Sequence, residues 1–285
     1  MTTIAKRRKG AAPLGRADRS PFSMWFWEID RVLLLLVLLL VSIGLIAVAA
    51  ASPAAAARHM VGEGHLPPLY YFWRQVGFVA LGLPVMFVIS TMPTQMARRY
   101  ALFGAAFFSV MLVTVPLIGS SANGAQRWIG SGMLRFQPSE FLKPFYVVAM
   151  AWMLSLREQE PTLPIVPLTG ALTAIIAALL MKEPDFGQTI IFCMSWLALM
   201  LLGGMSMKLI GLFGAAGGVG VVAAYEFYPV ATQRINDFLF PALGEHNQID
   251  AAHETIMAGG LFGTGPGAGV MKYRLPESHT DYIFS

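Results

Sequence analysis

Seven long apolar segments divide the sequence, and the first of them, residues 32–51, contains no charged residue. A helix needs about 20 mostly apolar residues to cross a bilayer. The seven segments are residues 32–51, 70–90, 100–119, 141–156, 165–181, 186–205 and 209–225. They predict an all-α, polytopic integral membrane protein with seven transmembrane helices. Residues 282–285 look like the start of an eighth helix.

Charge is scarce and unevenly placed along the chain. Only 13% of the residues are charged, against about 25% in soluble domains, which excludes most soluble globular enzymes. The whole chain has a net charge of +4, whereas residues 1–20 hold six basic residues and one acidic residue. The positive charge therefore belongs to a terminal tail and not to a nucleic-acid-binding face. A basic tail before the first apolar segment predicts a cytoplasmic N-terminus.

The segments define four regions. Residues 1–30 are a basic tail with an interfacial segment, and residues 31–225 hold helices 1 to 7. Residues 226–281 form a large extracytoplasmic loop, and residues 282–285 begin helix 8. The connecting residues 52–69 look like a plain linker. Residues 256–270 are rich in glycine but lack the Gly-Lys-Ser/Thr ending of a phosphate-binding loop. They indicate instead a backbone that approaches a ligand or bends sharply beside the membrane.

Two glycines in the seventh apolar segment have the spacing of close helix packing. Gly214 and Gly218 are four residues apart. Small residues at this spacing let two transmembrane helices approach closely. The pattern therefore predicts tight packing on this face of the helix.

Glu140 and Lys143 are ionisable residues at the start of an apolar segment. Such groups are costly in a membrane unless they are paired or line a wet cavity. The i, i+3 spacing places both on one helical face, where they can neutralise each other. A structural ion pair and a site role are both open, and they are compatible. Pro138 suits the start of this helix, and Ser139 can cap it.

Two further charged motifs lie between apolar segments. Residues 182–185 (KEPD) read as a capped surface turn. Arg127 stands beside Trp128, a pair that fits an interfacial belt or a site for a lipid phosphate.

The densest group of reactive side chains lies just before residue 282. Residues 277–281 (ESHTD) combine two carboxylates, an imidazole and two hydroxyls. A low-dielectric setting can raise the basicity of Asp281 and make it a general base. Capping of the following helix is the alternative role for Asp281.

Five ordered blocks of sequence resemble one known family. The blocks are residues 123–129 (NGAQRWI), 137–143 (QPSEFLK), 183–189 (EPDFGQT), 259–263 (GGLFG) and 275–284 (LPESHTDYIF). Through these five blocks, the chain resembles the SEDS family (shape, elongation, division and sporulation) of FtsW- and RodA-like proteins. The stretch from residues 27–31 (WEIDR) through 51–53 (ASP), with the loop at residues 265–267 (GPG), looks more like the division branch of that family.

The resemblance implies a ten-helix bacterial inner-membrane protein that polymerises lipid II into glycan strands. It implies a class B penicillin-binding protein, an FtsI-like transpeptidase, as partner, together with other proteins of the division machinery. It implies a multi-pass protein at the division septum and no role for nucleic acid. Relative to the ten-helix pattern, the sequence lacks the last three helices.

The resemblance also implies the site residues. Asp281 matches the catalytic residue of the family. The residues implied to bind substrate or line the cavity are Arg127, Gln137, Ser139, Glu140, Lys143, Lys272, Glu277, His279 and Thr280.

The implied reaction needs one base and cationic stabilisation of a diphosphate leaving group. Asp281 would deprotonate the acceptor 4-hydroxyl, while Arg127, Lys143, Lys272 or Arg274 would stabilise the diphosphate. We expect no resident metal site, although Mg²⁺ or Mn²⁺ could assist at the diphosphate. Two other functions are open: a lipid II flippase, and a non-catalytic scaffold that recruits the penicillin-binding protein.

Overall fold

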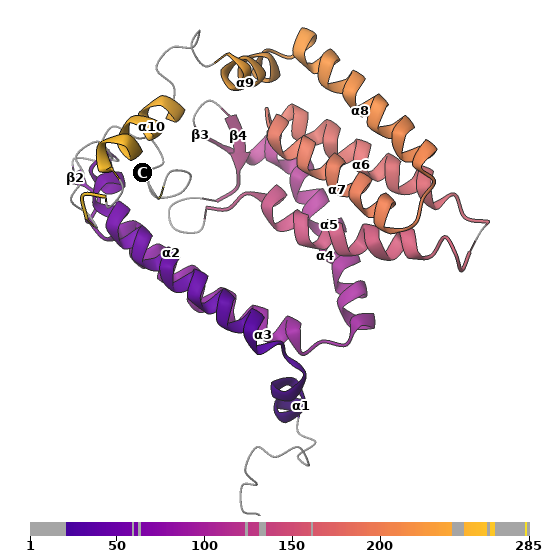
Figure 1. The fold of residues 1–285 in the computed structure, drawn as a ribbon, viewed down its shortest axis with the longest axis horizontal. Coiled ribbons are helices and arrows are strands. Elements are labelled where there is room, and N and C mark those ends of the chain that lie inside the picture. The colour runs from indigo at the N-terminus through magenta and orange to yellow at the C-terminus, as the bar shows by residue number, and fades with distance from the viewer. Residues whose placement is uncertain are drawn as a thin grey trace, which may run out of the picture. The chain divides into compact units, whose positions relative to one another are not determined.

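The computed structural model describes residues 21–58, 60–61, 64–122, 125–130, 135–160, 162–240, 248–260, 263–265 and 283. The chain forms two compact units (Figure 1). One consists of Met1–Met92 with His246–Ser285, and the other of Pro93–Glu245.

The first unit is built on two long helices. Its elements are α1 (Pro21–Glu28), α2 (Arg31–Arg58), β1 (Met60–Val61), β2 (Gly64–His65), α3 (Tyr70–Ser90) and α10 (Gln248–Gly259). α2 packs against α3, and β1 pairs with β2 in an antiparallel hairpin beyond the end of α2. The prediction of a linker from residue 52 is wrong for residues 52–58, which continue α2. The alanines at 54–57 have the highest helix propensity, and three of them are buried.

The second unit is a helical bundle with a small hairpin. Its elements are α4 (Thr94–Ile118), β3 (Ser120–Ala122), β4 (Ala125–Trp128), α5 (Pro138–Ser155), α6 (Ile165–Lys182), α7 (Phe186–Leu202), α8 (Met207–Phe227) and α9 (Pro229–Leu239). α5 packs against α4, α6 and α7. The buried cluster Leu112, Leu142, Tyr146, Leu180 and Phe192 joins these four helices. Their ribbons lie side by side in Figure 1.

All seven predicted segments are helical, which confirms the all-α membrane fold. Within the described residues, five helices are long and apolar enough to cross a membrane, namely α2, α3, α4, α6 and α8. α7 is apolar but has only 17 residues. α5 carries Glu140 and Lys143 in its first two turns, and its neighbours bury Leu142, Tyr146 and Met150 on one face. The helix that carries the charges is therefore packed against protein along one face, while Phe141 and Val148 on α5 are exposed.

The predicted extracytoplasmic loop contains two helices, α9 and α10. Both helices are too polar to be recognised as apolar segments, so the sequence pattern does not predict them. The described glycines after α10 confirm the predicted bends, because Gly260, Gly263 and Gly265 have φ angles of +62°, +70° and +97°.

The predicted close packing in α8 is wrong for the part of the chain that the structure describes. A Cβ added at Gly214 or Gly218 would meet no atom within 4 Å. α8 instead contacts its neighbours through Leu209, Ile210 and Phe213, near its first turns.

Candidate functional site: a polar network at the turn between α6 and α7

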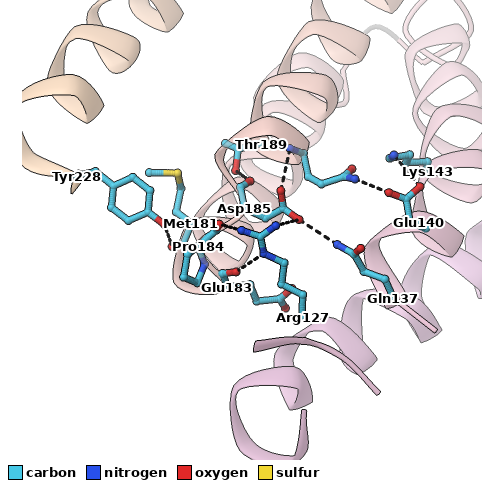
Figure 2. A network of polar contacts seen from close by, with 11 residues as sticks. Arg127, Gln137, Glu140, Lys143, Met181, Glu183, Pro184, Asp185, Thr189 and Tyr228 are labelled. Carbon is cyan, nitrogen blue, oxygen red and sulfur yellow. Dashed lines mark hydrogen bonds and ion pairs between the residues drawn. The ribbon is translucent and has the colours of Figure 1, made fainter. Parts of the chain in front are cut away.

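The turn between α6 and α7 is the centre of a group of polar contacts (Figure 2). This α6–α7 turn consists of Glu183, Pro184 and Asp185. Arg127 reaches it from β4: Nε donates to the carbonyl oxygen of Glu183 at 3.0 Å, and Nη2 donates to that of Pro184. A cation at the carboxyl end of a helix is favoured because the last carbonyl groups carry partial negative charge. Arg127 thus fastens the β3–β4 hairpin to the end of α6.

Asp185 receives contacts on both carboxylate oxygens. Oδ2 accepts a hydrogen bond from Gln137 Nε2 at 2.9 Å and lies 3.6 Å from Arg127 Nη1. Oδ1 accepts from the backbone N–H of Gln188 at 3.4 Å, so Asp185 is the N-cap of α7. The predicted capped turn is confirmed. Its predicted surface position is wrong, because Asp185 is only 6% exposed and lies among groups from β4 and the start of α5.

Gln188 links this buried aspartate to the ion pair on α5. Its side-chain Nε2 donates to Glu140 Oε1, and Lys143 Nζ donates to Glu140 Oε2 at 2.8 Å. The predicted pairing of Glu140 with Lys143 is confirmed. The side chains of Lys143 and Glu140 are 29% and 48% exposed, so the contacts run from a buried turn to a solvent-accessible ion pair. We define the polar network as Arg127, Gln137, Glu140, Lys143, Asp185 and Gln188.

The start of α5 differs from the prediction by two residues. Gln137, not Ser139, occupies the N-cap position, because Pro138 at the first helical position starts the helix earlier. Gln137 makes no side-chain capping bond and donates to Asp185 instead. Ser139 is buried, and its hydroxyl has no hydrogen-bond partner among the described residues.

Glu183 is the most deeply buried carboxylate of the turn. Its side chain is 1% exposed, and within the described residues neither carboxylate oxygen has a hydrogen-bond partner. Burial, and to a smaller extent the charge of Asp185, raises the pKa of Glu183 to about 8, although Arg127 opposes the shift. Glu183 is therefore mostly protonated at neutral pH.

Tyr228 joins the junction of α8 and α9 to the same end of α6. Its hydroxyl donates to the carbonyl oxygen of Met181 at 2.9 Å (Figure 2). Burial raises the pKa of this phenol. The end of α6 is therefore contacted by the α8–α9 junction, in addition to the contacts that β4 and the start of α5 make with the turn.

We expect Glu183→Gln to change the pH dependence of stability. The folded state holds the Glu183 proton up to about pH 8, while the unfolded chain releases it near its ordinary pKa of about 4.3. Stability from this group is fully present below the unfolded pKa and is lost as pH rises toward 8, at up to about 1.4 kcal/mol per pH unit. The neutral amide removes this slope. Thermal unfolding of detergent-solubilised protein between pH 5 and 9 measures it.

The control for this experiment is Glu160→Gln, at an exposed carboxylate in the loop after α5. It should follow the wild-type curve. Parallel curves for wild type and Glu183→Gln across the whole pH range would contradict the raised pKa of Glu183.

Five predicted site residues lie outside the described residues: Asp281, His279, Thr280, Glu277 and Lys272. Their roles stay predictions. Of the other five, the structure brings together Arg127, Gln137, Glu140 and Lys143, either directly or through Asp185 and Gln188. Ser139 lies beside Glu140 in the chain but makes no polar contact with the described part of the network.

No group of three or more His, Cys, Asp or Glu side chains in the described part of the chain is arranged to hold a metal ion. A divalent cation at the lipid diphosphate stays a prediction.

Four residues of this region were not predicted as site residues: Glu183, Asp185, Gln188 and Tyr228. Residues 183–189 did stand out as a sequence block, so the signal was present for three of them. A charged turn between two apolar segments predicts solvent exposure, and this is why the sequence does not single out these residues. Tyr228 has no comparable local signal, because its partner lies 47 residues earlier.

The fold and the polar network define a multi-pass, all-helical membrane protein with ionisable groups clustered at the end of a helical bundle. The family model of FtsW, RodA and SpoVE, described as a cell cycle protein, matches residues 30–285. The chain belongs to this family.

Curated relatives agree with the family match. The chain is 34% identical over 270 residues to a protein from Caulobacter vibrioides named "Probable peptidoglycan glycosyltransferase FtsW", covering 95% of this chain and 68% of that protein. It is 33% identical to a protein of the same name from Coxiella burnetii, covering 76% of this chain and 61% of that protein. The chain thus spans about two thirds of the length of these relatives.

Two solved structures have a similar fold. The rod-shape-determining protein RodA from Thermus thermophilus aligns with a TM-score of 0.53 at 25% identity, over 66% of this chain and 59% of that chain. A structure described as "Structural coordination of polymerization and crosslinking by a peptidoglycan synthase complex" aligns with a TM-score of 0.61 at 23% identity. That alignment covers 81% of this chain and 64% of the other, and it supports the fold alone.

Proposed function

We propose that this protein is a peptidoglycan glycosyltransferase that polymerises lipid II into glycan strands during septal wall synthesis. The names of its relatives support this function. The observation that carries it is the polar network, which links Arg127 of β4, through Asp185 and Gln188, to the accessible pair Glu140 and Lys143. Placing ionisable groups in a bundle of apolar helices costs free energy, so such a network marks a site for a polar ligand.

Within the network, Lys143 and Arg127 have different roles. Lys143 pairs with Glu140 but keeps 29% of its side chain exposed, so its ammonium can also donate to a diphosphate oxygen. Arg127 is committed to two carbonyl groups and Asp185. Its role is to hold the hairpin in place, and Lys143, with Lys272 and Arg274, is the better candidate for charge stabilisation.

The reaction is a direct displacement at the anomeric carbon of MurNAc. Asp281 accepts the proton of the GlcNAc 4-hydroxyl, and the oxygen forms a bond to the anomeric carbon. The bond from that carbon to the diphosphate oxygen breaks, and undecaprenyl diphosphate leaves with the electron pair. A single displacement inverts the α-linked donor to a β-linked strand.

The partner and the location belong to the same proposal. The partner is a class B penicillin-binding protein of the FtsI type, which crosslinks the strands. The N-terminus faces the cytoplasm, because the basic tail precedes the first span. The protein acts in the bacterial inner membrane at the division septum.

Labelled lipid II tests the function. Purified protein with its class B partner is expected to convert lipid II into a ladder of glycan strands on a denaturing gel. A parallel assay follows transfer of the lipid II headgroup across liposomes. Headgroup transfer without polymer, from protein with a cooperative unfolding transition, would replace the enzyme with a flippase. Absence of both activities would support a scaffold.

A further inference from the structure

A layer of three polar residues covers one end of the apolar core of the second unit. The core cluster contains one buried residue from each of α5, α6 and α7, namely Leu142, Leu180 and Phe192. One helical turn nearer the α6–α7 turn, the same three chain segments carry Ser139, Glu183 and Gln188. Residues three or four apart lie on the same face of a helix. We call Ser139, Glu183 and Gln188 the polar layer.

The polar layer holds buried atoms that lack partners. Ser139 is 0% exposed and Glu183 is 1% exposed. Within the described residues, no hydrogen bond reaches the Ser139 hydroxyl, either carboxyl oxygen of Glu183 or Oε1 of Gln188, although all these atoms are buried. Such atoms cost free energy, so in folded proteins they are nearly always paired with protein or with ordered water. Their position in one layer indicates a small ligand with several hydrogen-bonding groups.

The orientation of the Gln188 amide follows from its contact with α5. Glu140 is paired with Lys143, so its carboxylate oxygens can only accept hydrogen bonds. The Gln188 Nε2 group therefore faces Glu140, to which it donates. Oε1 is then directed away from Glu140 and is buried. A hydrogen-bond donor at Oε1 would hold the amide in this orientation.

Water matches the polar layer better than a cation does. Glu183 is mostly protonated at neutral pH, so its carboxyl group can donate and accept, as the Ser139 hydroxyl can. A water molecule has two donors and two acceptors, and a buried water makes about three hydrogen bonds. A cation would need an ionised Glu183, and the Arg127 guanidinium, with Nε 3.0 Å from the Glu183 carbonyl oxygen, would repel it.

We propose that a buried water molecule bridges Ser139, Glu183 and Gln188 and holds the Gln188 amide toward Glu140. At this level α5 contributes only a serine, whereas the next residues on its buried face are Leu142 and Tyr146, so the layer has room for a small ligand. Ser139 thus supports the polar network through water, from the buried side of the bundle. The proposal does not depend on the proposed enzyme activity.

The sign of the effect of Ser139→Ala tests the bridge. The substitution removes one partner of the water and is expected to raise the equilibrium constant for denaturant unfolding in detergent by roughly tenfold. A hydroxyl with no partner predicts a decrease, because alanine removes an unsatisfied group. Ser155→Ala on the same helix is the control. The exposed Ser155 hydroxyl bonds only to the Trp152 carbonyl, so this variant should change the constant by less than about threefold.

Hydroxyl-radical labelling detects the water itself. An X-ray pulse forms radicals from bound as well as bulk water, and radicals from a buried water oxidise the side chains beside it. Leu142 and Phe192 are 0% and 1% exposed, so we expect their oxidation in the full-length chain to come from the buried water. The oxidation should be lost in Ser139→Val, whose larger side chain fills the site. Met200 is the control, because it is 0% exposed within a separate apolar cluster and should stay unmodified.

Three results would overturn the proposal. The first is an unchanged or lower unfolding constant for Ser139→Ala. The second is the absence of oxidation at Leu142 and Phe192 in the wild type, which together with a destabilised Ser139→Ala would indicate a direct bond to a part of the chain outside the described residues. The third is a stability that rises with Na⁺ or Mg²⁺ at constant ionic strength in the wild type but not in Ser139→Ala, which would assign the site to a cation.

Discussion

Asp281→Asn is expected to lower the rate of lipid II polymerisation by at least about 100-fold, because general-base catalysis contributes roughly 10² to 10⁴ in rate. The amide keeps the size of the side chain but cannot accept the proton of the acceptor hydroxyl. Binding of lipid II should change little, since in the proposed reaction the diphosphate is held by cationic groups and not by Asp281. The measurement is the initial rate of strand formation with the class B partner present.

Two variants make the Asp281 result specific. Asp281→Glu keeps the base and should recover part of the activity with an altered pH profile, whereas a helix cap would gain nothing catalytic from it. Glu254→Gln is the control, at an exposed carboxylate on α10, and it should retain the wild-type rate. A normal rate for correctly folded Asp281→Asn would remove Asp281 from the reaction.

Arg127→Ala is expected to destabilise the protein by about 3–5 kcal/mol, the usual cost of removing one partner of a buried ion pair. The substitution leaves Asp185 buried without its cation and removes the donors to the carbonyl groups of Glu183 and Pro184. Arg127→Lys should recover only part of the loss, because an ammonium cannot reproduce the planar fork of a guanidinium. Denaturant unfolding in detergent measures the effect.

The control for this series is Arg99→Ala, at an exposed arginine in the first turns of α4. It should change stability by less than about 0.5 kcal/mol. A double-mutant cycle with Asp185→Ala tests the pairing: the double variant should lose less stability than the sum of the two single variants. Strict additivity would show that Arg127 and Asp185 do not interact.

Much of the fold could be predicted because a membrane span has a local signature. Each of the seven predicted segments lies on a helix, since about 20 apolar residues can satisfy their backbone in lipid only as a helix. The errors occur where that signature is absent. α9 and α10 are polar, and α2 continues through Pro53 because the alanines after it favour helix.

The candidate site divides in the same way. Glu140 and Lys143 are three residues apart, so helical geometry alone pairs them. Arg127 and Glu183 are 56 residues apart, and Gln188 and Glu140 are 48 residues apart. No local pattern specifies these contacts, which depend on how α5, α6, α7 and the hairpin pack.

The sequence alone determines the membrane class, the helical segments, the family and the local ion pair. These depend on apolar length, charge count and spacing within one or two helical turns. Only the tertiary structure places Arg127 on the α6–α7 turn and connects Asp185 through Gln188 to Glu140. It also buries Glu183, for which the sequence predicts a position in a surface turn. The physical reason is that burial, and the pKa shift that burial causes, are properties of the packed bundle and not of any segment within it.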